Sequence, residues 1–195
     1  MISTNTTVDL VLPVGTRDHM QGLIAAPIVL VEYVDYQCPY CAQAVSIVRE
    51  LQYELGDRLC YVVRHFPLVD LHFQAMRAAE AAEAAAAQNQ FWQMHYSLFE
   101  FPSALSETNL FHYARKLGLD TDLFVGEASL KENRDLNHQH HLRHIQEDIK
   151  TGIESGVDST PTFFINEVRH VGNWEVQIEG DFVIVILIVS SYLLI

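Results

Sequence analysis

The sequence predicts an α/β fold in which an all-helical insertion interrupts the sheet-forming parts. A strand, a helix and a second strand follow one another before residue 67, a long block of helical periodicity comes next, and strand character returns after residue 160. A strand-helix-strand unit of this kind pairs its two strands in parallel. We therefore divide the chain into residues 1–66, a helical insertion at residues 67–155 and a second sheet-forming part at residues 156–195.

Composition excludes several classes of protein. The 195 residues include 25 acidic and 12 basic ones, which gives a formal net charge of −13, and 49% of them are apolar. This apolar share suffices for a folded core, and an acidic balance without blocks of Lys or Arg argues against nucleic acid as a partner. Three cysteines are too few for a disulfide-rich scaffold, so at most one pair forms.

Residues 1–13 give no sign of export. They are polar with scattered Val and Leu, and they lack the basic leader and the apolar run of a signal peptide. We therefore expect a cytoplasmic protein as the sequence is written, and a periplasmic or other extracytoplasmic one if the start codon is mis-assigned.

The first strand-helix-strand unit is predicted from three runs of residues. Ile28 to Tyr36 is a nearly unbroken run of β-branched and aromatic residues, which is typical of a buried central strand. Apolar residues then recur at helical spacing from Cys41 to Leu55, and Gly56 is suited to end that helix. Leu59 to Phe66 predicts the second strand. The Cys-Pro-Tyr-Cys sequence at residues 38–41 therefore lies between a strand and a helix.

The predicted insertion has the pattern of several helices. Nine alanines occur among the thirteen residues from Ala75 to Ala87, and helical spacing continues, so we expect mostly helix from Leu71 to Phe99. Ser106 is suited to cap a helix that reaches Leu117. A longer helix is expected from about Leu130 to Gly156.

The last part of the chain predicts a hairpin and an unusual tail. Thr162 to Ile165 and Val168 to Val171 have strand character, and the turn-like Asn166-Glu167 between them predicts an antiparallel hairpin. Phe182 to Ile195 is uncharged and atypically apolar, but its fourteen residues fall short of the roughly 20 that span a bilayer. We expect a packed strand or helix there, with a sticky tail or a shifted reading frame as alternatives and membrane association disfavoured.

Cys38 is the candidate nucleophile. At the start of a helix, unpaired backbone N–H groups and the positive end of the helix dipole stabilise a thiolate and lower the pKa of a cysteine. Cys41 follows one turn later on the apolar face, where it could resolve a mixed disulfide formed at Cys38. Pro39 suits the first turn of a helix. The alternatives are half of a zinc site, for which a second CxxC or CxxH pair is missing, or two incidental cysteines.

Glu32 is the candidate proton carrier. On an alternating strand it shares a face with Leu30 and Val34, and burial among apolar neighbours raises the pKa of a carboxyl group towards neutrality. Glu32 could then take and return the proton of Cys41. The alternative is a carboxylate at the strand end that reaches water. Asp35 is a weaker substitute because it lies nearer the strand end and on the other face.

Thr160-Pro161 precedes the first strand of the predicted hairpin. A proline at the first position of a strand need not donate to the hydrogen-bond ladder. If this peptide bond is cis, the backbone of Thr160 can lie beside the active-site turn and pair with an extended segment of a substrate. The sequence leaves the isomer open.

Other histidines and cysteines receive simpler interpretations. Four histidines with i,i+3 and i,i+4 spacing could hold a metal ion on one helical face: His138, His140, His141 and His144. We favour solvated side chains on an exposed helix and predict no metal site. His65 and His72 are expected to pack at the join with the insertion, with contact to the active site as the alternative. Cys60 is expected to be a buried small apolar residue.

Three segments are distinctive in combination. They are VEYVDYQCPYC at Val31 to Cys41, RHFPL at Arg64 to Leu68, and GVDSTPTFFIN at Gly156 to Asn166. Together they resemble the DsbA-like branch of the thioredoxin superfamily. The resemblance covers roughly residues 22–174 and includes the helical insertion, which that family places inside a thioredoxin fold.

The resemblance implies thiol–disulfide exchange on proteins without a bound cofactor. By position, it implies that Cys38 attacks, Cys41 resolves, Glu32 is the buried acid and Pro161 is a cis proline beside the disulfide. We expect four residues to contact the substrate: Thr160, Pro161, Pro39 and Tyr40. The expected partners are protein thiols or disulfides and a redox partner that recycles the cysteine pair.

Two other functions stay open. A glutathione-dependent isomerase of small molecules would use the same fold, although the presence of both cysteines argues against it. A non-enzymatic metal-binding or chaperone-like module would rest on the histidines and a helical groove. Whether the cysteine pair oxidises, reduces or isomerises depends on how strongly the thiolate of Cys38 is stabilised, because a more stable reduced form makes the disulfide a stronger oxidant.

Overall fold

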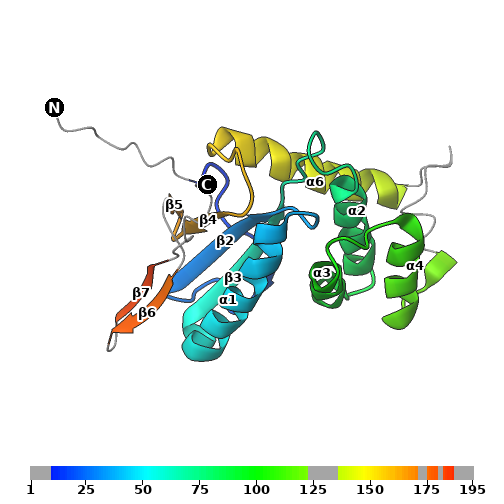
Figure 1. Cartoon of the computed structure of the whole chain (residues 1–195). Coiled ribbons are helices and arrows are strands. Elements are labelled where there is room, and N and C mark those ends of the chain that lie inside the picture. The colour runs from blue at the N-terminus through cyan, green and yellow to red at the C-terminus, as the bar shows by residue number, and fades with distance from the viewer. Residues whose placement is uncertain (1–9, 123–135, 171–174, 180–181, 187–195) are drawn as a thin grey trace, which may run out of the picture.

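A computed structural model gives the fold of the chain and describes residues 10–122, 136–170, 175–179 and 182–186. Its elements are β1 (His19–Gln21), β2 (Ile28–Val34), α1 (Pro39–Leu55), η1 (Gly56–Arg58), β3 (Leu59–His65), α2 (Ala75–Ala86), α3 (Phe91–Glu100), α4 (Glu107–Lys116), α6 (Leu136–Glu154), β4 (Thr162–Ile165), β5 (Val168–Arg169), β6 (Glu175–Glu179) and β7 (Phe182–Ile186). Strands therefore stand at both ends of the described chain, and the helices α2 to α6 stand between them (Figure 1).

A five-stranded sheet in the order β1-β3-β2-β4-β5 forms the centre of the fold. β2 and β3 are parallel and α1 connects them, whereas the other neighbouring strands pair in antiparallel fashion. The predicted strand-helix-strand unit is confirmed, and so is the α/β fold with helices inserted between its sheet-forming parts. The division of the chain at residues 66 and 155 stays a prediction. Helix α6 contacts both α2 of the insertion and β3 of the sheet.

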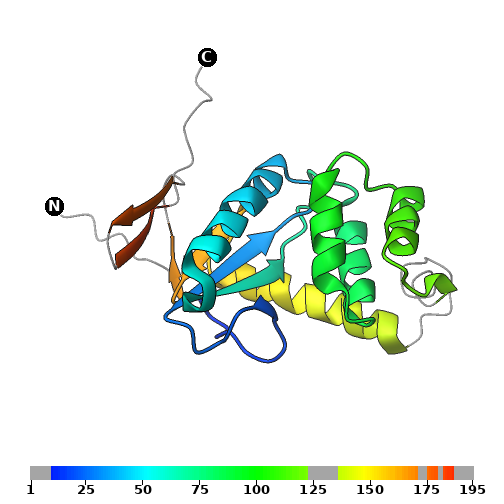
Figure 2. The same cartoon turned by 90° about the horizontal axis from the view of Figure 1, so that it is seen from below.

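Both faces of the sheet are covered. Leu59, Tyr61 and Val63 of β3 belong to the core on the side of α1, whereas Cys60 and Val62 belong to a second core. Alternate residues of a strand point to opposite faces. Two views at right angles place α1 and α6 on opposite sides of the central strands (Figure 1, Figure 2). A strand buried on both faces has a nearly continuous apolar sequence, as β2 and β3 have.

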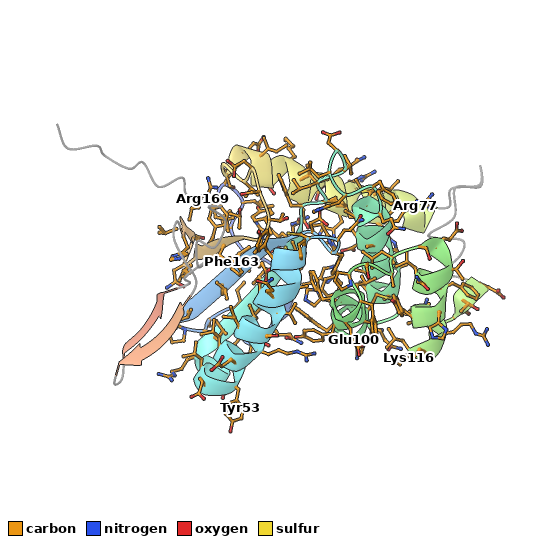
Figure 3. All side chains as sticks on the ribbon, in the orientation of Figure 1. Tyr53, Arg77, Glu100, Lys116, Phe163 and Arg169 are labelled. Carbon is orange, nitrogen blue, oxygen red and sulfur yellow. The ribbon has the colours of Figure 1, made fainter. Side chains whose placement is uncertain are left out.

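Helix α1 begins and ends where the sequence predicts. Pro39 is its first residue, and Gly56 caps its end with a φ of 51°, a backbone conformation that favours glycine. One face is buried, whereas Tyr53 points into solvent and is 86% exposed (Figure 3). Phe163 of β4 lies inside the core that this helix covers (Figure 3).

The helices of the insertion differ from the prediction in two respects. The helix expected from Leu71 begins only at Ala75. The stretch expected to be mostly helix from Leu71 to Phe99 divides into α2 and α3. Asn89 has a φ of 59° at the break, and the N–H of Gln90 bonds to the carbonyl of Ala85, so the chain turns sharply there. The predicted cap is confirmed, because Ser106 is the N-cap of α4 and its side chain accepts a hydrogen bond from the N–H of Asn109.

The predicted hairpin of β4 and β5 is confirmed. Asn166 and Glu167 have φ values of 47° and 70°, which is the pairing of positive angles typical of a tight two-residue hairpin turn. Val171, expected in the second strand, lies outside the described residues. β6 and β7 form a separate two-stranded sheet. β6 was not expected, and β7 makes the first part of the apolar tail a strand.

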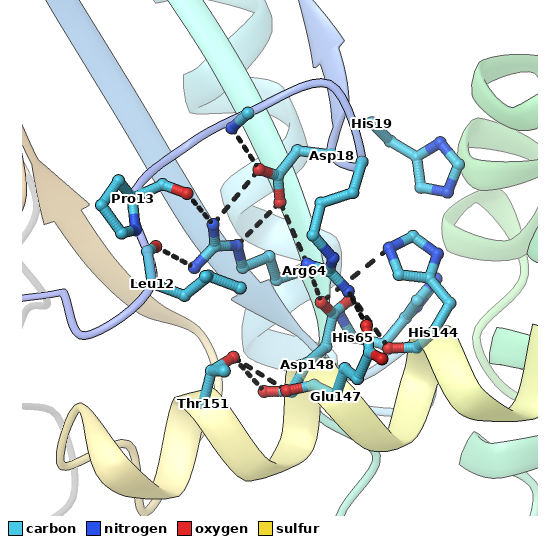
Figure 4. Close-up of polar contacts among 12 residues, drawn as sticks. Leu12, Pro13, Asp18, His19, Arg64, His65, His144, Glu147, Asp148 and Thr151 are labelled. Atoms are coloured by element: carbon cyan, nitrogen blue, oxygen red, sulfur yellow. Dashed lines mark hydrogen bonds and ion pairs between the residues drawn. The ribbon is translucent and has the colours of Figure 1, made fainter.

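Strand β1 and the segment before it were also missed. The buried side chain of Arg64 explains how this segment is fixed. It binds the carboxylate of Asp18 through two nitrogens, at 2.8 and 3.2 Å, and it donates to the carbonyls of Leu12 and Pro13 (Figure 4). A strand of three residues is too short to show the alternation of polar and apolar residues that predicts a strand, and the arginine that fixes the preceding segment is distant in the sequence.

No helix among residues 10–122 and 136–170 is both long enough and apolar enough to cross a membrane.

Candidate active site

The Cys-Pro-Tyr-Cys sequence lies after the carboxyl end of β2, where α1 begins. Cys38 is the N-cap residue of α1, and Pro39 fills the first helical position. Proline fits there because its φ suits the helix and its missing N–H would have no helical partner. Cys41 follows in the same turn and is fully buried, whereas Cys38 is 4% exposed. The two thiols share one helix end, and only the first reaches the surface.

The sulfur of Cys38 is acidic. Its pKa is lowered to about 6, first by a hydrogen bond from the thiol of Cys41, while burial opposes the shift. Hydrogen bonds from the backbone of Cys41, from Thr160 and from the backbone of Tyr40 act in the same direction as the first. An anionic sulfur is favoured at this position because the free N–H groups of the first turn point at it. At neutral pH the side chain of Cys38 is therefore mostly a thiolate.

Cys41 has the opposite character. Burial raises its pKa well above the ordinary value, and the hydrogen bond with Cys38 and the negative charges of Glu32 and Cys38 add to the effect. Its thiol thus stays protonated at neutral pH and serves as a hydrogen-bond donor. One helix turn therefore holds an ionised sulfur beside a protonated one, which is the difference that a nucleophile and a resolving thiol need.

Glu32 is buried in the middle of the sheet. It lies on β2 between Val63 of β3 and Phe163 of β4, and it is 1% exposed. Its Oε2 accepts a hydrogen bond of 2.5 Å from the hydroxyl of Tyr61. Burial raises the pKa of Glu32 to about 8, although the bond from Tyr61 opposes this and the charge of Cys38 adds to it. The alternative of a strand-end carboxylate in contact with water is excluded, and the relay role stays a prediction.

Asp35 holds the loops around the site. Its Oδ1 accepts from the N–H of Gln37 at 2.7 Å, and its Oδ2 accepts from the N–H of Leu68 and the Nδ1 of His72, both at 2.8 Å. Both carboxylate oxygens therefore accept hydrogen bonds from loop residues and none from a cysteine side chain. Because these bonds fix the carboxylate in the loop, the geometry gives Asp35 a positioning role and does not support it as a substitute for Glu32. His72, expected to pack at the join with the insertion, is partly exposed and bonds to Asp35 instead.

The Thr160-Pro161 peptide bond is cis. The backbone of Thr160 lies next to the active-site turn, and its carbonyl oxygen is 3.2 Å from the Cys38 sulfur, which donates a hydrogen bond to it when protonated. Pro161 follows it and leads into β4, which pairs with β2. The structure thus brings together Cys38, Cys41 and Thr160-Pro161. The roles of these residues toward a substrate stay predictions.

Apolar side chains are exposed around this turn. Tyr40 is 47% exposed, and the loop before α2 carries Leu71 and Phe73, which are 73% and 80% exposed. This loop is tied to the active-site turn, because Asp35 binds its residues Leu68 and His72. Leu71 and Phe73 have no signal in the sequence that points to this site, since neither belongs to a motif or to the buried side of a helix.

The histidines of α6 contradict the expectation of a solvated face. His141 is buried, and His144 is mostly buried with its Nδ1 3.0 Å from Oε2 of Glu83. This side of α6 packs against α2, and Glu83 lies among the buried alanines of α2. A glutamate on the apolar face of an alanine-rich helix was the signal that could have revealed this contact. The side chains of His138 and His140 lie outside the described residues.

His65 and Cys60 have the roles expected of them. His65 is buried at the end of β3, and its Nε2 lies 2.8 Å from Oε1 of Glu83. Cys60 is fully buried on the face of β3 that belongs to the second core, with Val62 and Phe164. Because Cys41 lies in the core on the other face of the sheet, Cys60 is a separate packing residue.

Curated relatives match most of this chain but a minor part of their own length. The protein named Na(+)/H(+) antiporter NhaA 3 of Salinispora tropica is 42% identical over 87% of this chain and 25% of its own length. The protein named Na(+)/H(+) antiporter NhaA 1 of Mycolicibacterium vanbaalenii is 37% identical over 82% of this chain and 25% of its own length. The chain thus spans about a quarter of these relatives.

Solved structures share the fold over most of both chains. A thioredoxin-like oxidoreductase from Silicibacter pomeroyi is 25% identical with a TM-score of 0.67, covering 80% of this chain and 83% of that one. The thiol-disulfide exchange protein alpha-DsbA2 from Wolbachia pipientis is 20% identical with a TM-score of 0.68, covering 80% of each chain. BdbD from Bacillus subtilis is 23% identical with a TM-score of 0.66, covering 85% and 90%.

A family model settles the classification. The model described as Thioredoxin matches residues 15–179, which include the cysteine pair, the inserted helices and the cis proline. The solved structures with the same arrangement confirm the predicted thioredoxin fold with a helical insertion. The chain therefore belongs to the thioredoxin family.

Proposed function

We propose that this chain exchanges disulfides with protein substrates through Cys38 and Cys41. One observation carries the proposal: the pKa of Cys38 is lowered to about 6, while burial raises the pKa of its neighbour Cys41 well above the ordinary value. Disulfide exchange requires a thiolate that attacks and a second thiol that is held back until the mixed disulfide has formed. The family supplies the oxidoreductase class, and the cysteine pair supplies the reaction.

In the reducing direction, the Cys38 thiolate attacks one sulfur of a client disulfide. A bond forms between Cys38 and that sulfur, and the other client sulfur leaves as a thiolate that takes a proton from water. Cys41 then loses its proton and attacks the Cys38 sulfur, which forms the internal disulfide and releases the second client thiolate. The client gains two electrons and the cysteine pair loses them. Oxidation of a client dithiol is the reverse sequence.

Glu32 acts in the second step as the acceptor of the Cys41 proton. Burial raises the pKa of Glu32 to about 8, and the charge of the Cys38 thiolate adds to this effect, so the carboxyl group is largely protonated at pH 7. The mixed disulfide removes that charge. The pKa of Glu32 then falls, and its carboxylate becomes available at the stage when Cys41 must be deprotonated.

The substrate is an extended protein segment beside the cis proline. The Thr160 carbonyl accepts a hydrogen bond from Cys38 only while that sulfur is protonated, so with the thiolate and in the mixed disulfide it is available to pair with the backbone of a client. Pro39 and the exposed ring of Tyr40 flank the sulfur, and the exposed Leu71 and Phe73 offer apolar surface on the neighbouring loop. Such surface suits a protein client better than a small polar thiol such as glutathione.

The direction of exchange depends on the partner that recycles the pair. A stabilised Cys38 thiolate favours the reduced form, which makes the disulfide form an oxidant. Net oxidation of clients then needs an oxidising compartment or a dedicated electron acceptor. The antiporter names belong to proteins of which the matched stretch is a quarter, and sodium–proton exchange would be an activity of those whole proteins.

Three cysteine variants test the proposal. Cys38→Ser should abolish insulin reduction and ribonuclease refolding, Cys41→Ser should accumulate mixed disulfides with clients, and Cys60→Ser should retain the parent activity because Cys60 lies in the other core. Unchanged exchange in Cys38→Ser would refute the assignment. A glutathione-dependent isomerase that does not need the resolving thiol would instead keep its activity in Cys41→Ser.

A further inference from the structure

A second cluster of reactive side chains lies away from the cysteine pair, around the carboxylate of Glu83. The Nε2 of His19 lies 2.7 Å and the Nε2 of His65 lies 2.8 Å from Oε1 of Glu83, and the Nδ1 of His144 lies 3.0 Å from its Oε2. These residues come from β1, β3, α2 and α6. Four elements that are far apart in the sequence thus direct three imidazole rings at one buried carboxylate.

Three members of the cluster are arranged as a set of metal ligands. One ligand atom from each of His19, Glu83 and His144 lies within 4.8 Å of the other two. Figure 4 shows the rings of His19 and His144 next to each other, and their centroids are 5.3 Å apart. Two imidazole nitrogens and one carboxylate oxygen form a ligand set that binds zinc in open sites, where water or another molecule takes the fourth position.

We propose that His19, Glu83 and His144 bind a divalent transition metal ion, for which zinc is the best chemical match. The metal ion takes the place of the protons that now lie between the two rings and the carboxylate, and both imidazoles bind in their neutral form. The proposal does not depend on the redox function, because none of these residues contacts the cysteines.

The surroundings of the three residues support such a site. His65 binds Oε1 of Glu83 from the buried side, and a hydrogen bond of this kind orients a carboxylate ligand. His144 is also close to a second carboxylate, with its Nε2 4.0 Å from Oδ1 of Asp148. The nearby guanidinium of Arg17 is neutralised, because its NH1 lies 2.8 Å from the same Asp148 oxygen. A cation therefore does not face an unpaired positive charge from Arg17.

The three residues also face open space. His19, Glu83 and His144 line a pocket of about 610 Å³, whose other charged or imidazole side chains are Arg17, His141, Arg143 and Glu147. The pocket gives an ion a path to the ligands and leaves room for a water molecule in the fourth position. Since the ligands come from β1, α2 and α6, a bound ion would link the N-terminal strand to two helices of the insertion. We therefore expect metal binding to stabilise the folded chain.

The test is a calorimetric zinc titration of the full chain, carried out with Cys38, Cys41 and Cys60 all replaced by serine so that no thiolate binds the ion. The parent in this background should bind a single zinc ion. His19→Gln keeps a hydrogen-bond donor for Glu83 but loses the imidazole, and it should weaken binding by about tenfold or more. His65→Gln should weaken it less, because His65 only orients the carboxylate.

His140→Ala and His112→Ala are the matched controls. His140 shares α6 with His144 at helical spacing, and His112 is an exposed histidine of α4. Both variants should bind zinc like the parent. Loss of binding in His140→Ala with none in His19→Gln would overturn the proposal in favour of a site along one helix, and parent-like binding by His19→Gln would also overturn it.

A cobalt spectrum separates binding from folding. Co²⁺ added to the same serine background should give visible bands of nitrogen and oxygen ligation, and zinc should remove them by competition. The bands should be lost in His144→Asn while its circular dichroism stays that of the folded parent. Parent-like bands in this variant would overturn the assignment of His144, as would zinc that leaves the thermal unfolding midpoint of the parent unchanged.

Discussion

The Cys38 sulfur lies 3.2 Å from the carbonyl oxygen of Thr160 and donates a hydrogen bond to it when protonated, although 122 positions separate the two residues. The sheet creates this contact. β4 pairs with β2, so the residues just before β4 lie next to the residues just after β2. The helices from α2 to α6 leave and rejoin the sheet between these two points. The site therefore needs the sheet for its geometry and tolerates a large insertion between its halves.

Replacing Glu32 with Gln should slow the resolving step. We expect attack of Cys41 on a Cys38 mixed disulfide to slow by about 100-fold, which is the usual contribution of a general base, while the first attack by Cys38 keeps its rate. The measurement is the release of a chromophoric thiol from a mixed disulfide preformed at Cys38. Equal release rates in the parent and in Glu32→Gln would contradict the relay role.

Tyr61→Phe provides a sharper test of the same residue. The hydroxyl of Tyr61 donates to Glu32 and lowers its pKa, so its removal should raise that pKa further. The base form of Glu32 then appears only at higher pH. The pH profile of the resolving step should therefore shift upward, with little change in its limiting rate. An unshifted profile would indicate that another group accepts the proton.

The stability of the reduced protein should depend on pH through Cys38. Its folded pKa of about 6 lies below the ordinary value of 9.0, so its thiolate stabilises the fold. This contribution is complete above the ordinary value and is lost as the pH falls through the folded value. Urea unfolding of the reduced parent, compared with Cys38→Ser, should show an advantage that grows from pH 6 to pH 9. A constant difference across this window would exclude the stabilised thiolate.

The close approach of α6 to the sheet predicts a second effect on stability. A Cβ atom added at Gly152 would lie 2.9 Å from ring carbons of both Tyr33 and Phe66, which are buried. Gly152→Ala should therefore destabilise the fold by about 1–3 kcal/mol, the usual cost of overpacking. Ile153→Ala, on the exposed side of the same helix, serves as the control and should change the free energy of unfolding by about 0.5 kcal/mol or less.

The buried ion pair of Arg64 and Asp18 should be more sensitive than any surface pair. Asp18→Asn leaves the charge of Arg64 without its carboxylate partner, and breaking such a buried pair costs about 3–5 kcal/mol. Removal of the exposed pair of Lys150 and Glu154 should cost about 1 kcal/mol or less. Urea unfolding measures both. Equal losses would show that Arg64 finds other partners when Asp18 is neutral.

Much of the fold was predictable because its elements carry local signals. β2 and β3 are continuous apolar runs, α1 has Pro39 at its start and Gly56 at its end, and Ser106 caps α4. Each signal acts within a few residues, so one sequence reveals it. The cysteine pair and Glu32 were found for the same reason, since their positions on a helix end and on a strand face follow from local periodicity.

The features that were missed depend on distant residues. β1 is only three residues long, and the segment before it is fixed by Arg64, 46 positions beyond Asp18. The break between α2 and α3 falls within an alanine-rich helical pattern that continues on both sides. The histidines of α6 appeared solvated because their partner, Glu83, lies 61 positions from His144 on another helix. Such contacts form only when the tertiary fold brings their residues together.

The acidity of the Cys38 sulfur is the property on which the proposed function depends. It is measured most directly by the alkylation rate of Cys38 across pH, with the modified residue identified by mass spectrometry in Cys60→Ser protein. The rate should reach half its maximum near pH 6, because the pKa of Cys38 is lowered to about 6. A half-maximum near the ordinary value of 9.0 would contradict the account and leave the fold without an activated thiol.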